Sequence, residues 1–206
     1  MSMKTFSETF LADTTEVLAK IGVDDIEQVV ETLAATRARK GRLFLAGSGG
    51  GAGHASHAAC DFRKLCHIES YCVTDNVSEL TARTNDEGWD TAYSNWLQAS
   101  RIDNDDCLFV FSVGGGSIEP PVSVNLVNAI RAAKSVGASV VGIVGRNGGV
   151  LREMADASVL IPTVSPAFIT PQAEGLQALV WHLIVSHPTL AASTAKWEGL
   201  DQVVPK

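Results

Sequence analysis

The sequence of 206 residues is poor in positive charge: it has 16 lysines and arginines against 23 aspartates and glutamates, for a formal net charge of −7. A chain this acidic lacks the general basic surface that holds nucleic acid by its phosphates. It can still bind an anionic metabolite, because backbone amides, helix ends or a metal ion act locally. We therefore expect a small-molecule ligand and no nucleic-acid partner.

The sequence also lacks long hydrophobic runs and paired cysteines. No apolar run approaches the ~20 residues that span a bilayer. The first ten residues, MSMKTFSETF, are polar and do not resemble a signal peptide. None of the four cysteines forms a CxxC pair, so the spacing of a zinc ribbon is missing. We expect a cytoplasmic protein without membrane contact, whose thiols are free and act mostly as small buried hydrophobes.

Short apolar runs alternate with helical patterns along most of the chain. Apolar residues at helical spacing predict helices over the first forty residues. Five apolar runs predict strands at 42–46, 69–73, 107–111, 139–144 and 158–161. Helical patterns cover 52–65, 77–84, 89–99, 122–136 and 170–186. This alternation predicts an α/β fold, a doubly wound five-stranded parallel sheet sandwich with N-terminal helices. We expect one structural domain overall, made of a helical segment at 1–40 and the sheet domain at 41–206.

Three of the predicted strands end in glycine-rich loops, at 47–53 (GSGGGAG), 112–117 (SVGGGS) and 145–149 (GRNGG). Parallel strands place such loops at one edge of the sheet, where doubly wound folds bind ligands. The first loop lacks the Gly-Lys-Ser/Thr ending of a P-loop, and it is a poor dinucleotide fingerprint. Taken alone, it is as well explained by a structural turn as by an anion site. The second loop has two hydroxyls and suits a backbone nest around phosphate. Arg146 in the third loop either faces an anion or, more commonly for such a residue, lies solvated on the surface.

A candidate metal site is divided between two predicted helices. His57 and Asp61 are four residues apart and share one helix face, and Glu174 and His182 lie about two turns apart. Two imidazoles and two carboxylates suit zinc or a similar divalent ion. Each residue also has an ordinary explanation: a capping or interior histidine, a solvated charge, or an acid near a helix N-terminus. His182 is the hardest to explain away, because an unpaired imidazole in the apolar segment LVWHLIV would be costly.

Taken together, these segments resemble one enzyme family over nearly the whole chain. The segments are GSGGGAGHASHAACDF (47–62), TDNVSELTARTNDEGW (74–89), FSVGGGS (111–117), VGRNGG (144–149) and EGLQALVWH (174–182). They resemble the phosphoheptose isomerases, which act on sedoheptulose 7-phosphate and form a branch of the SIS (sugar isomerase) domain proteins. The resemblance implies an SIS domain, a homotetramer with the N-terminal helices between subunits, and a zinc ion. The implied metal ligands are His57, Asp61, Glu174 and His182.

The resemblance also implies an aldose–ketose isomerisation that gives D-glycero-D-manno-heptose 7-phosphate through an enediol, with Asp61 as base and His182 as acid. Ser112, Ser117 and the amides of residues 49–52 would hold the phosphate. The implied substrate-binding residues are Ser48, Gly49, Gly50, Gly51, Ala52, Asp86, Ser112, Val113, Gly114, Ser117 and Glu174.

The sequence departs from the family pattern in ways that leave alternatives open. Asp61 replaces a glutamate and Glu174 a glutamine, while Val113, Gly114 and Gly116 replace polar positions of the phosphate loop. Either backbone amides hold more of the phosphate, or the enzyme isomerises a different sugar phosphate. SIS domains also occur in non-catalytic sugar-phosphate sensors and assembly proteins, which usually lack the acid and histidine pair. The presence of that pair favours an enzyme.

Overall fold

The computed structural model describes residues 5–200, with side chains described for residues 5–198. The predicted segments 1–40 and 41–206 therefore include residues 1–4 and 201–206, which lie outside the described part. The centre of the fold is a parallel sheet with the strand order β2-β1-β3-β4-β5. The strands are β1 (Leu43–Gly47), β2 (Ser70–Cys72), β3 (Cys107–Ser112), β4 (Ser139–Val144) and β5 (Ala157–Leu160). The predicted α/β fold with a five-stranded parallel sheet and N-terminal helices is confirmed.

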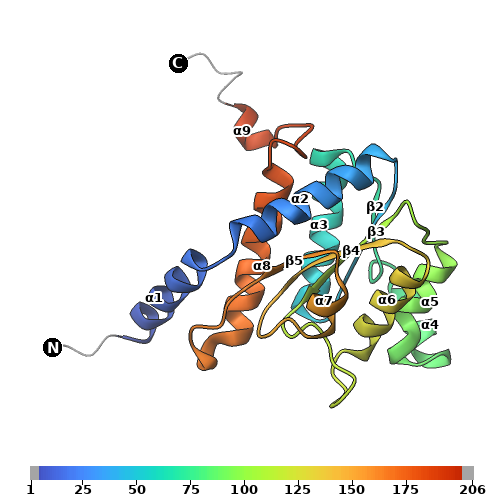
Figure 1. The fold of residues 1–206 in the computed structure, drawn as a ribbon, viewed down its shortest axis with the longest axis horizontal. Coiled ribbons are helices and arrows are strands. Elements are labelled where there is room, and N and C mark those ends of the chain that lie inside the picture. The colour runs from blue at the N-terminus through green and yellow to red at the C-terminus, as the bar shows by residue number, and fades with distance from the viewer. Residues whose placement is uncertain (1–4, 201–206) are drawn as a thin grey trace.

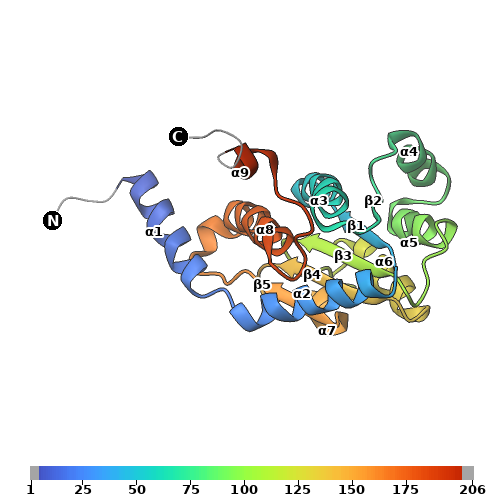
Figure 2. The same ribbon diagram turned by 90° about the horizontal axis from the view of Figure 1, so that it is seen from above.

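Helices cover both faces of the sheet (Figures 1 and 2). They are α1 (Phe6–Ala19), α2 (Val23–Ala38), α3 (Gly50–Cys66), α4 (Val77–Asp86), α5 (Trp89–Ala99), α6 (Val124–Ser135), α7 (Gly149–Met154), the 3-10 helix η1 (Pro166–Phe168), α8 (Ile169–Ser186) and α9 (Lys196–Leu200). One core lies under α2, α3 and α8, and a second lies under α5, α6 and α7. The β3 side chains alternate between them: Phe109 faces the first core, whereas Leu108 and Val110 face the second.

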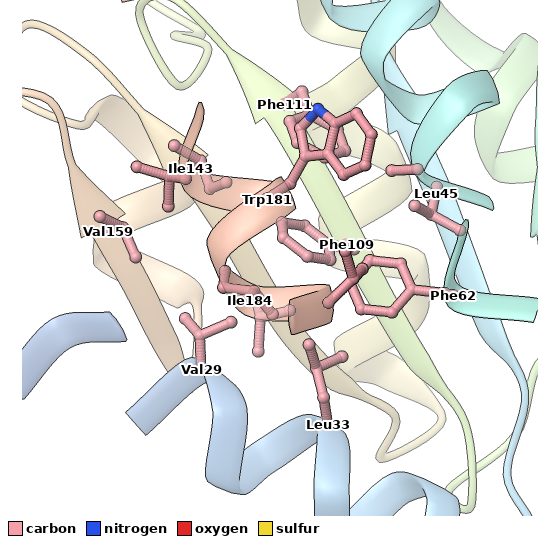
Figure 3. Close-up of a cluster of buried hydrophobic side chains, with 14 of the residues drawn as sticks. Val29, Leu33, Leu45, Phe62, Phe109, Phe111, Ile143, Val159, Trp181 and Ile184 are labelled. Atoms are coloured by element: carbon pink, nitrogen blue, oxygen red, sulfur yellow. The ribbon is translucent and has the colours of Figure 1, made fainter. Parts of the chain in front are cut away.

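The first core is rich in aromatic and branched side chains (Figure 3). Phe109 and Phe111 stack with 4.8 Å between ring centroids, and Trp181 of α8 packs into the same cluster. Burial of such side chains is worth roughly 1.5–3 kcal/mol each. This packing holds α3 and α8 side by side across the sheet, which decides where their polar faces meet.

Helix α1 differs from the other long helices because it extends away from the sheet in both views (Figures 1 and 2). It begins with a capping box between Thr5 and Glu8, so its start is locally encoded. Among its apolar residues, Val17 is buried, whereas Phe6 is 72% exposed. The role of the N-terminal helices in oligomerisation remains a prediction that this exposed apolar face supports.

The observed elements differ from the predicted ones mainly at short segments. Helix α7 was not predicted: it begins at Gly149, immediately after the left-handed Gly148, inside the stretch interpreted as a loop. Strand β2 has three residues, where five were predicted. The four cysteines form no disulfide, and burial raises the pKa of Cys66 to about 11 and that of Cys107 to about 12. No helix in the described residues combines the length and apolar character needed to cross a membrane.

Candidate active site

The glycine-rich loops after β1 and β3 border a hollow at the carboxyl edge of the sheet. The strand order reverses between these two neighbours, which is where open α/β sheets bind ligands. The hollow has a volume of about 260 Å³. It is lined by Ser48, Phe111, Ser112, Val113, Gly114, Val122, Ser123, Leu126 and Arg146. Four of the predicted substrate-binding residues, Ser48, Ser112, Val113 and Gly114, therefore lie together.

The second loop is held rigidly at this edge. The Ser112 hydroxyl accepts a hydrogen bond from the Gly115 amide at 2.9 Å, and a β-carbon at Gly115 would overlap the Gly148 carbonyl. The amide of Leu151, in the first turn of α7, donates to the Gly115 carbonyl at 2.9 Å. Beneath the loop, the buried Gln177 amide donates to the carbonyls of Ser112 (2.9 Å) and Ile143 (3.0 Å). The loop is thus preorganised without a ligand.

The predicted Ser117 does not line this hollow. Its backbone pairs with Val122 in an isolated antiparallel bridge, and its side chain lies in a neighbouring hollow of about 360 Å³. Ser123 takes its place, at the N-cap of α6, where its side chain makes no capping hydrogen bond. The segment 118–122 separates the two serines, so the sequence pattern pointed to the nearer one. The N-terminus of α6 adds a partial positive charge at the hollow.

The first loop is less available to an anion than predicted. The amides of Gly51 and Ala52 already donate to the carbonyls of Ser48 (3.1 Å) and Gly49 (3.0 Å). A β-carbon at Gly50 would lie 2.6 Å from Cδ of Glu174, so this carboxylate covers the start of α3. A carboxylate at a helix N-terminus is stabilising, but it repels a phosphate from the same position. Phosphate binding by Gly49, Gly50, Gly51 and Ala52 remains a prediction without support from this geometry.

Three of the four predicted metal ligands meet where α3 and α8 pack together. His57, Asp61 and His182 each offer a ligand atom within 4.8 Å of the others. His57 Nε2 lies 3.8 Å from Asp61 Oδ2, and the rings of His57 and His182 have centroids 5.5 Å apart. Nδ1 of His182 lies 2.7 Å from the Ala178 carbonyl, to which it donates, which leaves Nε2 free.

This donor set suits a divalent metal ion. Two imidazoles and one carboxylate are a common ligand set of catalytic zinc, in which a fourth position stays open for water or substrate. Trp181 is buried, and its ring stacks on that of His182 with 3.5 Å between centroids. The centroids of the Trp181 and His57 rings are 4.8 Å apart, so Trp181 forms an apolar wall beside the cluster.

The chain is similar to known proteins over most of its length. The family model of the SIS domain matches residues 9–145. A phosphoheptose isomerase from Sulfurimonas denitrificans is 30% identical over 167 residues, which cover 79% of this chain and 80% of that protein. The chain belongs to the phosphoheptose isomerase branch of the SIS-domain family.

The chain is also similar to a further curated protein and to solved structures. The lincomycin biosynthesis protein LmbN from Streptomyces lincolnensis is 36% identical over 188 residues, which cover 86% of this chain but only 66% of LmbN. Among solved structures, phosphoheptose isomerase GmhA from Neisseria gonorrhoeae has a TM-score of 0.73 and 26% identity, covering 88% of this chain and 97% of that chain. A phosphoheptose isomerase from Francisella tularensis has a TM-score of 0.76 at 18% identity, covering 89% and 97%, and supports the fold alone.

In this SIS domain, Glu174 stands apart from the three clustered ligands. It lies about two turns before His182 on α8, and its carboxylate lies against Gly50 and close to His54. Its assignment as a fourth ligand remains a prediction. Asp86 is exposed at the end of α4, where it accepts a hydrogen bond from the side-chain amide of Asn85 at 2.7 Å. It does not line the hollow of about 260 Å³.

His182 is exposed, and the prediction that it lies in an apolar interior is wrong. Its helix turns Trp181 into the core and leaves His182 exposed beside Leu179 and Leu183, which are exposed as well. The imidazole is therefore not buried in an apolar interior. It is exposed, and its position is defined by the ring of Trp181 and the carbonyl of Ala178.

His54 was left without a role by the sequence, yet it lies between the two halves of the site. Burial lowers the pKa of His54, which the nearby Glu174 carboxylate opposes. Its Nε2 is buried and has no hydrogen-bond partner among the described residues. No local spacing could reveal this position, because the contact depends on how α8 packs against α3.

Proposed function

We propose that this protein converts sedoheptulose 7-phosphate, or a closely related ketose phosphate, into the corresponding aldose phosphate through an enediol. As a member of the phosphoheptose isomerase branch, the chain is a sugar-phosphate isomerase. The cluster of His57, Asp61 and His182 carries the finer proposal, because two of its acid–base and metal-binding groups lie on α3, the helix that begins beside the hollow, and the third joins them from α8.

The separation of the two parts suits a phosphorylated sugar. His57 lies two turns into α3, so about 10 Å of helix separates it from Gly50 beside the hollow. A sugar phosphate with its anion in the hollow would extend its reacting end along α3 towards the cluster. Holding the phosphate would position that end and lower the entropic cost of reaching the transition state.

We assign the proton transfer to Asp61, whose side chain is only 17% exposed. Its carboxylate would take the proton from the carbon beside the carbonyl and return it to the neighbouring carbon. A divalent ion held by His57, Asp61 and His182 would polarise the carbonyl and hydroxyl oxygens of the sugar. The single free nitrogen of His182 can bind a metal or donate a proton to a sugar oxygen, but it cannot do both at once.

A different sugar phosphate is the second candidate substrate. It is favoured by the second loop, where Val113 and Gly114 offer no hydroxyl, and by the similarity to LmbN, a protein of lincomycin biosynthesis. Zinc as the metal, a homotetramer and a cytoplasmic location remain parts of the proposal. The exposed apolar residues of α1 and α8 support an assembly of several subunits.

The proposal is tested by substrate conversion and exchange of the C1 and C2 protons, followed by NMR, for ketose phosphates of five to seven carbons. We expect chelation to abolish turnover and added divalent metal to restore it. Asp61→Asn should lower kcat/KM about a thousandfold, since a positioned base contributes roughly 10²–10⁴. Asp24→Asn, an exposed change on α2, is the matched control and should leave kcat/KM unchanged.

Full turnover by a metal-free Asp61→Asn, His182→Ala double variant would contradict the assignment of these residues. Turnover only with sugars other than sedoheptulose 7-phosphate would support the second candidate. A wild-type protein that binds sugar phosphates but holds no metal and exchanges no proton would instead be a non-catalytic sensor.

A further inference from the structure

The hollow of about 260 Å³ at the carboxyl edge offers uncharged hydrogen-bond donors and little positive charge. The hydroxyls of Ser112 and Ser123 line it, and Val113 and Gly114 contribute no polar side chain. The protein as a whole carries a formal charge of −7, which opposes the approach of a dianion. Recognition of a phosphate here therefore calls for a local cation.

Arg146 is the one charged residue among those that line this hollow. It follows directly after β4, at the carboxyl edge, and also lines the neighbouring hollow that contains Ser117. Its Cδ lies 3.6 Å from the position that a β-carbon of Gly114 would occupy, so its aliphatic stem lies over the second loop.

The Arg146 side chain is also free to bind an anion. Its guanidinium makes no ion pair and no hydrogen bond with any residue between 5 and 198. Its backbone has φ of 53°, a left-handed conformation that costs a non-glycine residue roughly 1–2 kcal/mol. Arg101 has the same backbone conformation at the opposite edge of the sheet, so the position of Arg146 at the hollow, and not its φ, distinguishes it.

We propose that Arg146 binds the phosphate of the substrate and supplies the positive charge that the second loop lacks. The inference rests on the proposed sugar-phosphate substrate. The planar guanidinium can donate two parallel hydrogen bonds to phosphate oxygens, while the Ser112 and Ser123 hydroxyls and the N-terminus of α6 provide the remaining donors. The opposite face of the phosphate is thereby held by a side chain from the third loop.

The test measures the affinity for inorganic phosphate by calorimetry at fixed ionic strength, for the full chain and its variants. Arg146→Gln should weaken binding about ten- to hundredfold, the range for one hydrogen-bonded charge. The phosphate affinity of Arg146→Lys should lie between those of the wild type and Arg146→Gln, because lysine keeps the positive charge but lacks the two parallel donors of the guanidinium. The KM for the phosphorylated ketose should rise by a similar factor, with a smaller change in kcat.

Arg101→Gln is the matched control. Arg101 is also exposed and also left-handed, with φ of 55°, but it lies before β3 at the opposite edge of the sheet. This variant changes the net charge and the backbone preference in the same way, so its phosphate affinity should stay within about twofold of the wild type. Equal affinities for the Arg146→Gln and Arg101→Gln proteins would overturn the proposal.

A second variant tests the geometry from the side of the loop. Gly114→Ser adds a hydroxyl at a position with ordinary contact to the Arg146 stem and without a positive φ. In the Arg146→Gln background, it should recover several-fold of the lost affinity by restoring a donor beside the phosphate. No recovery in a folded double variant would contradict the placement of the phosphate next to Gly114.

The outcomes also separate this inference from the isomerase proposal. Weaker phosphate binding by Arg146→Gln together with no turnover of any ketose phosphate would support Arg146 and contradict the isomerase. Turnover by Arg146→Gln with unchanged KM and unchanged phosphate affinity would support the isomerase and contradict the role of Arg146. A wild-type protein that binds neither inorganic phosphate nor any ketose phosphate, and turns none over, would contradict both.

Discussion

The two edges of the sheet treat their polar groups in opposite ways. At the amino edge, the Asp106 side chain is 2% exposed and accepts hydrogen bonds from the Arg42 amide and guanidinium and from the Asp103 amide, at 2.7–3.1 Å. At the carboxyl edge, His54 Nε2 and Asn125 Oδ1 are buried without partners among the described residues. Arg146 there is exposed and lines the hollow.

This difference indicates that the polar groups of one edge stabilise the fold, whereas those of the other edge are available to a ligand. Buried polar groups are normally hydrogen-bonded, so a group left without a partner either costs stability or awaits a ligand. At the amino edge, the buried charge of Asp106 is paired with Arg42 and so contributes to folding. The carboxyl edge keeps buried polar atoms of His54 and Asn125 without partners among the described residues, and it carries the glycine-rich loops.

Removing the buried acid of the amino edge should have the largest effect on stability. Asp106→Ala removes the acceptor of two backbone amides and the carboxylate partner of the Arg42 guanidinium, and we expect a loss of about 3 kcal/mol in the free energy of unfolding. Urea denaturation measures this loss. Asp105→Ala, the exposed neighbour, should change stability by less than about 0.5 kcal/mol. Phosphate affinity that fell along with stability in Asp106→Ala would break the separation between the edges.

A pair of glycine substitutions sharpens the comparison at the carboxyl edge itself. Gly115→Ala should cost about 2 kcal/mol, because its φ is 77° and a β-carbon would overlap the Gly148 carbonyl. Gly53→Ala, in the open first turns of α3, should instead stabilise the protein by about 0.5–1 kcal/mol. Thermal unfolding of both variants gives the sign directly. Equal effects would show that the second loop is not held against the third as described.

The smallest expected effect is a pH dependence from His54. Because burial lowers its pKa below the ordinary value of 6.5, the unfolded chain takes up a proton at a higher pH than the folded protein does. The contribution of this group to stability is therefore full above pH 6.5 and is lost as the pH falls towards the pKa of the folded state. Comparing urea midpoints at pH 8 and pH 5.5 should show a smaller drop in His54→Gln than in the wild type. An unchanged drop would mean that His54 is not held in its neutral form.

Most of the sheet could be predicted because its strands are buried on both faces. The runs around Phe109 and Val141 contain almost no polar residue, so no competing pattern exists, and β4 has the predicted bounds. Helix α7 was missed because six residues beginning in a glycine loop carry too little helical periodicity. Its position is decided by hydrogen bonds to the second loop, which no local pattern reports.

The site was predicted in the parts that depend on a single helix. His57 and Asp61 lie four residues apart on α3, and this spacing alone places them on one face. The position of Glu174 could not be predicted in the same way, because the rotation of α8 decides which of its residues meets His57. The choice between Ser117 and Ser123 likewise depended on the path of the intervening segment.

The sequence by itself determined the parallel sheet, the edge that carries the glycine loops and the nature of the groups available for chemistry. Tertiary structure alone decided which of those groups meet: His182 joins the α3 cluster, Glu174 covers the start of α3, and Arg146 lies over the second loop. The physical reason is that backbone periodicity is encoded within a few residues. The contacts between α3, α8 and the loops arise only when the shared apolar core packs them together.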